Sequence, residues 1–175
     1  KFCPVELLPL TNNKQDVLNK IDEMIANGVT HINLGAVWGW RVLSPSEPYT
    51  NGVAYEDENF NKAIIIMTDG ANFISSSFRQ YSGYGRLFEG KLGTTRRFAA
   101  QNELDNRLTD VCTKIKAKGI LVYTIVFQLF STSIQNLMSN CATDSGKFYN
   151  SPSGADLESA FRAIGAELSN LRIGR

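Results

Sequence analysis

Short, continuous runs of apolar residues alternate along this chain with longer stretches in which apolar residues recur every three or four positions. Residues 63–68 (AIIIMT) are too short and too rich in β-branched side chains for a helix, so they predict a buried strand. Residues 120–129 are apolar on both faces and predict the longest strand. Residues 5–10 (VELLPL) and 147–150 (KFYN) predict two further short strands.

The stretches between these runs have the periodicity of amphipathic helices. The first should follow a cap at Thr11 or Asn12 and stop at Gly28, and the third should end at Gly119. The predicted helices cover residues 13–27, residues 30–44, residues 102–118, residues 134–141, and a last stretch that Ser153 opens.

Strands that alternate with amphipathic helices indicate an α/β fold with a mainly parallel central sheet, covered on both sides as in a Rossmann-like three-layer sandwich. A chain of 175 residues suits a single domain. Such sheets bind ligands beyond the carboxyl ends of their strands. The loops of interest therefore follow residues 10, 68, 129 and 150.

Two connecting segments are unusually long, at about residues 44–61 and 71–101. The first carries the acidic run Glu56-Asp57-Glu58, and the second is rich in glycine and aromatic residues. Disordered segments are poor in aromatic residues. We therefore expect residues 71–101 to form a folded surface excursion next to the site.

Charge and hydropathy exclude some classes of function. Lys plus Arg number 18 and Asp plus Glu 17, so no strong field favours nucleic acid or an anionic membrane. The longest apolar run, residues 120–127, is too short to span a bilayer. The chain opens without an initiator Met or a leader pattern, so we expect a fragment, with any export signal or anchor outside these residues.

The three cysteines allow two interpretations. All three can be buried thiols of a cytosolic protein. Alternatively, Cys112 and Cys141 form a disulfide in an oxidising compartment and Cys3 pairs with something upstream.

Three residues are candidates for chemistry. Asp69 follows the predicted strand 63–68 in a Thr-Asp-Gly turn, and Thr30 opens the second predicted helix. Taken singly, the first is explained by turn geometry and the second by helix capping. His31, the one histidine, has no metal-ligand pattern and no nucleophile beside it, so we interpret it as structural.

In order along the chain, these pieces resemble the second half of a von Willebrand factor A (VWA) domain. Within that family, the chain more closely resembles TadG-like proteins of tight-adherence pilus systems, and this resemblance covers nearly the whole chain. The phrases that carry it are residues 8–11 (LPLT), 28–31 (GVTH), 38–45 (WGWRVLSP), 65–70 (IIMTDG), 112–116 (CTKIK), 119–125 (GILVYTI), 141–142 (CA) and 171–172 (LR).

The resemblance implies a metal-ion-dependent adhesion site that binds Mg²⁺ or Mn²⁺, to which this chain would contribute Thr30 and Asp69. It also implies an extracytoplasmic domain, anchored by an N-terminal membrane helix outside this chain, and it favours the Cys112–Cys141 disulfide. Its partners would be protein components of the pilus or the envelope.

The chain departs from the family in one respect. It contains no Asp-x-Ser-x-Ser motif, and hence lacks the strand that would carry most of the metal ligands. We therefore expect no tightly bound metal in this chain alone. A missing central strand would leave backbone hydrogen-bonding groups of its neighbouring strands unpaired. We therefore expect that an upstream segment completes the sheet, or that the chain fills the gap by self-association, strand exchange or a rearranged pairing of residues 5–10.

Three hypotheses follow. The first is an extracytoplasmic protein-binding domain without catalysis, acting through Thr30, Asp69 and the two long loops. The second is a metal-dependent hydrolase or phosphoryl-transfer enzyme using Asp69, although the chain shows no second strand-end carboxylate, P-loop or nucleophile–base pair. The third is a structural module with a degenerate metal site that holds a complex together through the aromatic loop.

Overall fold

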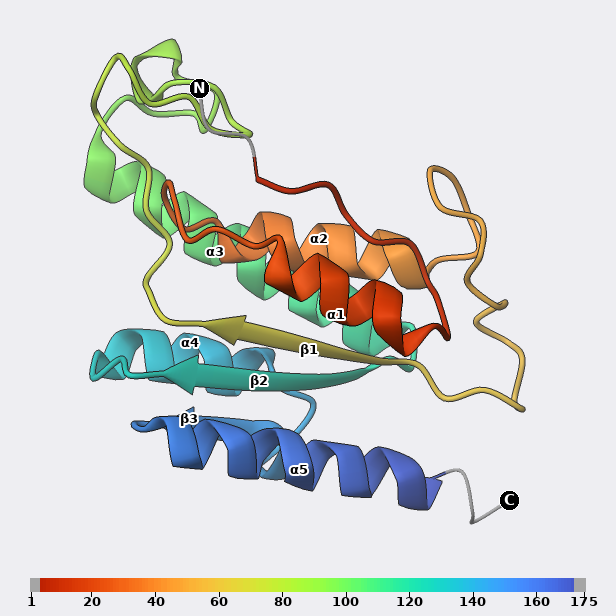
Figure 1. Ribbon diagram of the computed structural model, residues 1–175. Coiled ribbons are helices and arrows are strands. Elements are labelled where there is room, and N and C mark those ends of the chain that lie inside the picture. The colour runs from red at the N-terminus through yellow and green to blue at the C-terminus, as the bar shows by residue number, and fades with distance from the viewer. Residues whose placement is uncertain (1–3, 172–175) are drawn as a thin grey trace.

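The computed structural model describes residues 4–171 and has three layers, with a small parallel sheet between two layers of helices (Figure 1). The sheet contains β1 (Ala63–Thr68), β2 (Leu121–Phe127) and β3 (Phe148–Ser151) in the order β1-β2-β3. Both strand pairs are parallel. The predicted α/β class and parallel sheet are therefore confirmed.

One face of the sheet is covered by α2 (Ile32–Leu43), α3 (Arg97–Ala117) and α4 (Thr132–Cys141). The predicted apolar stripe of α3 lies against the sheet, and its Leu108 and Ile115 are fully buried. Fully burying such a side chain contributes about 1.5–3 kcal/mol, and this layer contains the largest of the clusters of buried hydrophobic residues. Its central core residues are Ile32, Ala36, Ile64, Ile66, Leu108, Cys112, Ile115, Val122, Val126, Ile134 and Met138.

The opposite face is covered by one helix, α5 (Gly154–Leu171), which packs on β2 and β3 (Figure 1). Ser153 precedes it and its hydroxyl and amide both donate to the Asp156 carboxylate, so the predicted helix start is confirmed. Ala160 and Ile164 of α5 bury Tyr123 and Ile125 of β2. The same face of β1 remains open.

A disulfide joins Cys112 of α3 to Cys141 at the end of α4, with 5.1 Å between their Cα atoms. Both residues are buried in the main core. The bridge ties together two helices on the same face of the sheet. Cys3 lies outside the described residues.

The segment between α2 and β1 is held against the fold by aromatic and cationic contacts. Trp40 donates a hydrogen bond from Nε1 to the Tyr55 hydroxyl at 3.0 Å. The Lys62 ammonium lies 4.4 Å from the Tyr55 ring and donates to the carbonyls of Leu43 and Val53. The Trp-Gly-Trp-Arg phrase therefore anchors this long connection.

The long segment after β1 is folded, as predicted. It contains a 3₁₀ turn (η1, Leu87–Glu89) and an isolated bridge between Ser82 and Gly85. Ile74, Leu87 and Leu92 form a separate small core with Ala100 and Leu104 of α3. α3 starts at Arg97, five residues before the predicted start at Asn102, because this small core covers its first turns.

The N-terminal region differs from the predictions. Residues 5–10 form no strand, and their side chains are mostly exposed. The first helix, α1 (Lys14–Asp22), is shorter than residues 13–27 and is capped by Asn13. None of its residues is buried, and no other helix or strand among the described residues packs extensively against it.

One remaining element is short. A second 3₁₀ turn, η2 (Ser145–Lys147), leads into β3.

Within residues 4–171, no helix combines the length and the apolar character that crossing a bilayer requires.

Candidate functional site

The candidate site lies at the carboxyl end of β1, where the chain turns through Thr68, Asp69 and Gly70. The Thr68 hydroxyl donates to the Gly70 carbonyl at 2.7 Å and accepts from the Gly70 amide at 3.2 Å. These bonds engage the buried Thr68 side chain within the turn. The Asp69 carboxylate is left exposed to solvent.

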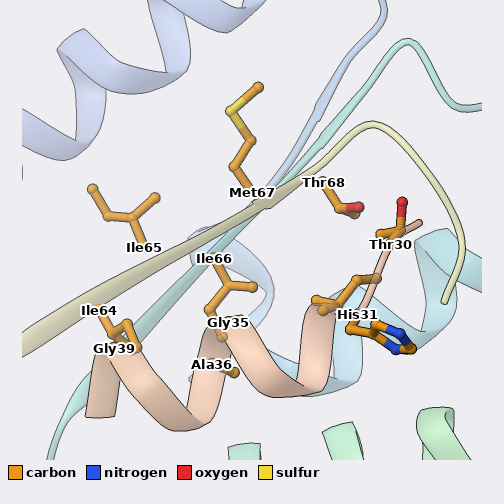
Figure 2. A pocket seen from close by; sticks show the side chains of 11 residues that line it. Thr30, His31, Gly35, Ala36, Gly39, Ile64, Ile65, Ile66, Met67 and Thr68 are labelled. Atoms are coloured by element: carbon orange, nitrogen blue, oxygen red, sulfur yellow. The ribbon is translucent and has the colours of Figure 1, made fainter. Parts of the chain in front are cut away.

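Thr30 lies against this turn (Figure 2). Its carbonyl accepts a hydrogen bond from the Phe73 amide at 2.9 Å, which ties the start of α2 to the segment after β1. A methyl group added at Gly70 would lie 3.3 Å from Thr30 Oγ1. Thr30 and the Asp69-Gly70 turn therefore share one rim of the sheet.

The Thr30 hydroxyl does not cap α2, which corrects the simpler interpretation of that residue. The N-cap position is His31, without a side-chain cap. The Ile32 amide instead donates to Oδ1 of Asn72, from the segment after β1, at 2.8 Å. The Thr30 hydroxyl forms no hydrogen bond to another described residue.

Thr30 and Asp69 supply one hydroxyl and one carboxylate at this rim. A Mg²⁺ ion requires near-octahedral ligation by about six oxygens. Among the described residues, no group of three or more His, Cys, Asp and Glu side chains could hold a metal ion. The residues present do not form a complete metal site, and the affinity of the chain for Mg²⁺ or Mn²⁺ stays a prediction.

A buried polar cluster that the sequence did not predict supports this rim from behind. Asn72 is fully buried and donates from Nδ2 to the Asp105 carboxylate of α3 at 2.8 Å. Burial raises the pKa of Asp105, and the bond from Asn72 opposes that shift. Asn33 donates to the Tyr84 hydroxyl at 2.6 Å. The cluster therefore fastens α2, α3 and the segment after β1 to one another.

His31 lies beside this cluster. Its two ring nitrogens are buried and have no hydrogen-bond partner among the described residues. The ring contacts Tyr84 edge to face, with 5.8 Å between the centroids. Burial lowers the pKa of His31 below its ordinary value, so the neutral imidazole is favoured. The structural role that the sequence suggested for this residue stays a prediction.

A groove of about 340 Å³ runs along β1 from this rim, between the strand and α2. Figure 2 shows Ile64 and Ile66 on the side of α2, with Ile65 and Met67 on the other side of β1. α2 contributes residues with small side chains, Gly35, Ala36 and Gly39. The sequence did not predict this groove, because it depends on the spacing of two elements far apart in the chain.

A surface rich in arginine and aromatic side chains covers the excursion between β1 and α3 and the first turn of α3. Arg97 lies 4.9 Å from the Phe98 ring and 5.9 Å from the Phe73 ring. Arg86 lies 5.3 Å from the Tyr81 ring and 5.9 Å from the Phe88 ring. We call this set of residues, together with Phe78, the arginine–aromatic surface; its aromatic exposures are Phe73 37%, Phe78 77%, Tyr81 65%, Phe88 53% and Phe98 71%.

The acidic run 56–58 has a local role in the structure. Asp57 Oδ1 accepts from the amide of Asn59 at 3.1 Å and from its side chain at 2.9 Å. This arrangement stabilises a turn in the segment between α2 and β1. Glu56 and Glu58 are exposed.

No family model and no curated protein matches the chain. Among solved structures, the fold is similar to part of the pilus adhesin SpaC from Lactobacillus rhamnosus GG, with a TM-score of 0.56 and 12% sequence identity. The match covers 88% of this chain and 21% of that adhesin chain. The chain therefore has a fold that occurs within a pilus adhesin, and it spans about a fifth of that protein's length.

Proposed function

We propose that this chain is part of an extracytoplasmic VWA-type domain that binds a protein partner of a pilus or cell-envelope system and carries out no catalysis. The observation that carries the proposal is the arginine–aromatic surface beside the rim formed by Thr30 and Asp69. Figure 1 shows the segment that bears this surface rising from the carboxyl end of β1.

The composition of this surface favours a protein partner. Aromatic residues and arginine are enriched at protein–protein interfaces and dominate their binding energy. Phe78, Tyr81 and Phe98 are each more than half exposed, although the small core beneath them is buried. Preordered, exposed aromatic side chains lose little conformational entropy on binding, so this surface is suited to recognition.

Two further observations support the envelope setting. The fold is similar to part of a pilus adhesin. The sequence phrases that resemble TadG-like proteins independently suggest a pilus system. The Cys112–Cys141 disulfide is of the kind that persists in oxidising compartments. We therefore propose a location outside the cytoplasm, with a membrane anchor elsewhere in the polypeptide.

The part of the proposal that concerns a metal ion involves two residues of this chain. Thr30 and Asp69 would supply a hydroxyl and a carboxylate to a Mg²⁺ or Mn²⁺ ion whose other ligands lie outside this chain. The exposed Asp69 is free to contribute to such a site. Hydrolysis is the weaker alternative, since the sequence shows no second strand-end carboxylate and no nucleophile–base pair to act with Asp69.

Binding to pili and envelopes isolated from the source organism tests the proposal. We expect Phe98→Ala and Arg97→Ala each to weaken binding at least tenfold, in line with hot-spot losses of about 2 kcal/mol. Phe60→Ala is the matched control, because Phe60 is 57% exposed but lies in the other long connection. Equal effects of Phe60→Ala and Phe98→Ala, or no binding by the wild-type chain, would contradict the proposal.

The metal part has its own readout. Mg²⁺ added after EDTA treatment should strengthen binding by the intact polypeptide, and Asp69→Asn should abolish that gain. Unchanged Mg²⁺ dependence in Asp69→Asn would exclude Asp69 as a ligand and leave the arginine–aromatic surface unaffected.

A further inference from the structure

The excursion between β1 and α3 is basic in a chain that is otherwise acidic. Residues 71–101 contain five basic residues and one acidic residue, so they carry a formal net charge of +4. The whole chain carries +1, which leaves −3 on the other residues. The basic residues are Arg79, Arg86, Lys91, Arg96 and Arg97, and the acidic one is Glu89. The positive charge is therefore local to the segment that projects beyond the carboxyl end of β1 (Figure 1).

The one acidic residue of this segment is already paired. Glu89 accepts a hydrogen bond from Nη1 of Arg86 at 3.3 Å, and its other carboxylate oxygen lies 3.1 Å from Nζ of Lys91. The contact with Lys91 is the largest of the influences that lower the pKa of Glu89, so the carboxylate is ionised at neutral pH. Glu89 therefore neutralises charge within the segment and is engaged by two of its five basic side chains.

The other three basic side chains are not paired in this way. Arg79, Arg96 and Arg97 are exposed, and none of them forms an ion pair with a carboxylate of residues 4–171. Elsewhere, Arg107 and Arg162 each pair with a glutamate four residues earlier on the same helix. The first turn of α3, where Arg97 lies, contains no acidic residue. These three arginines are thus the ones that a carboxylate of another molecule can reach.

The unpaired arginines lie among exposed aromatic rings. The guanidinium of Arg97 lies 4.9 Å from the centroid of the Phe98 ring, which is 71% exposed. A guanidinium stacked on a ring keeps the planar set of N–H donors that binds a carboxylate with two hydrogen bonds. The turn after η1 lies against the start of α3, since a methyl group added at Gly90 would lie 3.8 Å from Cγ2 of Thr95. Donors for a carboxylate and apolar rings are therefore offered side by side.

We infer that the partner presents an acidic protein segment to the arginine–aromatic surface, an inference that rests on the proposed function. Carboxylates of that segment bind Arg96 and Arg97, and an apolar side chain between them packs against Phe73 and Phe98. A protein fits this surface better than a phosphate polymer, because such polymers bind extended basic surfaces. Here the positive charge is confined to one segment in which arginine and aromatic residues predominate, as they do at protein–protein interfaces.

Charge reversal tests the inference in binding to isolated pili and envelopes, measured in EDTA so that no divalent ion contributes. Arg96→Glu should weaken binding at least tenfold, because it replaces an attraction with a repulsion. The variant should fold, since an acidic residue is favourable at the start of a helix. Lys114→Glu makes a matched reversal at an exposed position near the other end of α3, and it should leave the affinity unchanged.

Salt and chemical modification identify the charge on the partner. Between about 0.1 M and about 1 M salt the Debye length falls from about 10 Å to about 3 Å, so binding of the wild type should fall at least tenfold. Binding of Arg96→Glu should fall less. Converting the carboxylates of the pili and envelopes to amides, with a carbodiimide and methylamine, should reduce wild-type binding to the level of Arg96→Glu. Proteolysis of the pili and envelopes should remove it.

The outcomes separate this inference from the proposed function. Equal binding by Arg96→Glu and Lys114→Glu, or wild-type binding that survives amidation, would overturn the acidic segment. Binding that survives proteolysis would do the same and would indicate a phosphate polymer. If Phe98→Ala still weakens binding while Arg96→Glu does not, the proposed function stands and this inference alone fails. If the wild-type chain does not bind at all, both fail.

Discussion

The side-chain oxygen of Asn72 accepts a hydrogen bond from the backbone amide of Ile32, 2.8 Å away and 40 residues earlier in the chain. The amide nitrogen of the same side chain donates to Asp105 of α3. One buried side chain therefore caps α2 and joins it to α3, which fixes Thr30 beside the turn after β1.

Replacing Asn72 with alanine should be among the most damaging single changes near the rim. It leaves the Ile32 amide without its cap and the partly buried Asp105 without a donor, so we expect a loss of about 2–3 kcal/mol in the free energy of unfolding. Urea denaturation measures it. Asn106→Ala, an exposed change on α3, should cost less than about 0.5 kcal/mol; a similar cost in both variants would contradict the role of Asn72.

The stability of the chain should fall in mild acid because of His31. Burial lowers its pKa below the ordinary 6.5, so the unfolded chain binds this proton more readily than the folded one. The contribution of the neutral ring is complete above about pH 6.5 and is lost as the pH falls toward the folded-state pKa. Asp105, whose pKa burial raises, acts in the opposite direction, losing stability as the pH rises.

The difference between wild type and His31→Phe isolates the histidine, because the Asp105 contribution is present in both proteins. In unfolding midpoints measured at several pH values, the stability of wild type relative to His31→Phe should fall as the medium becomes more acidic. The chain has one histidine, so its NMR signal can be assigned without ambiguity. A titration midpoint at or above the ordinary value would refute this prediction.

The disulfide should contribute strongly to stability. It closes a loop between residues 29 apart in sequence, and removing a native bridge from a small domain typically costs about 2–5 kcal/mol. We expect the double variant Cys112→Ser, Cys141→Ser to lower the urea midpoint accordingly, and reduction of the wild type to do the same. Cys3→Ser serves as the control, and reduction should not affect the double variant further.

Two glycines should respond to alanine with opposite signs. Gly119, between α3 and β2, has φ +72°, a conformation that costs an L-residue about 1–2 kcal/mol. Gly165 lies within α5 with open space around it, so alanine there should stabilise the helix by about 0.5–1 kcal/mol. Thermal or urea unfolding of the two variants measures both effects, and a loss at Gly165 would show an unrecognised packing contact.

The elements predicted correctly are those whose sequence pattern and burial agree. β1 has the predicted limits because a short β-branched run is covered by α2 on one side and β2 at one edge. α3 keeps its apolar stripe, and Leu104, Leu108 and Ile115 are all fully buried. In these elements local preference and tertiary packing favour the same structure.

Residues 5–10 show why the same reasoning failed elsewhere. Their apolar run suits a strand, but a strand exists only where a neighbour accepts its backbone hydrogen bonds, and these residues have none in the structure. The role of Asn72 was equally hidden, since its partners Ile32 and Asp105 are far away in sequence. Such long-range pairs leave no periodic signal.

The excursion that bears the arginine–aromatic surface rests on its own small core, in which Ile74, Leu87 and Leu92 pack on the first turns of α3. Substitutions of exposed residues in the excursion should therefore have little effect on the packing of the sheet. Substitutions at Phe78 or Tyr81 that suit a new partner should therefore leave the fold intact. Related chains should vary most at these two positions and least at Leu104, which is part of the small core.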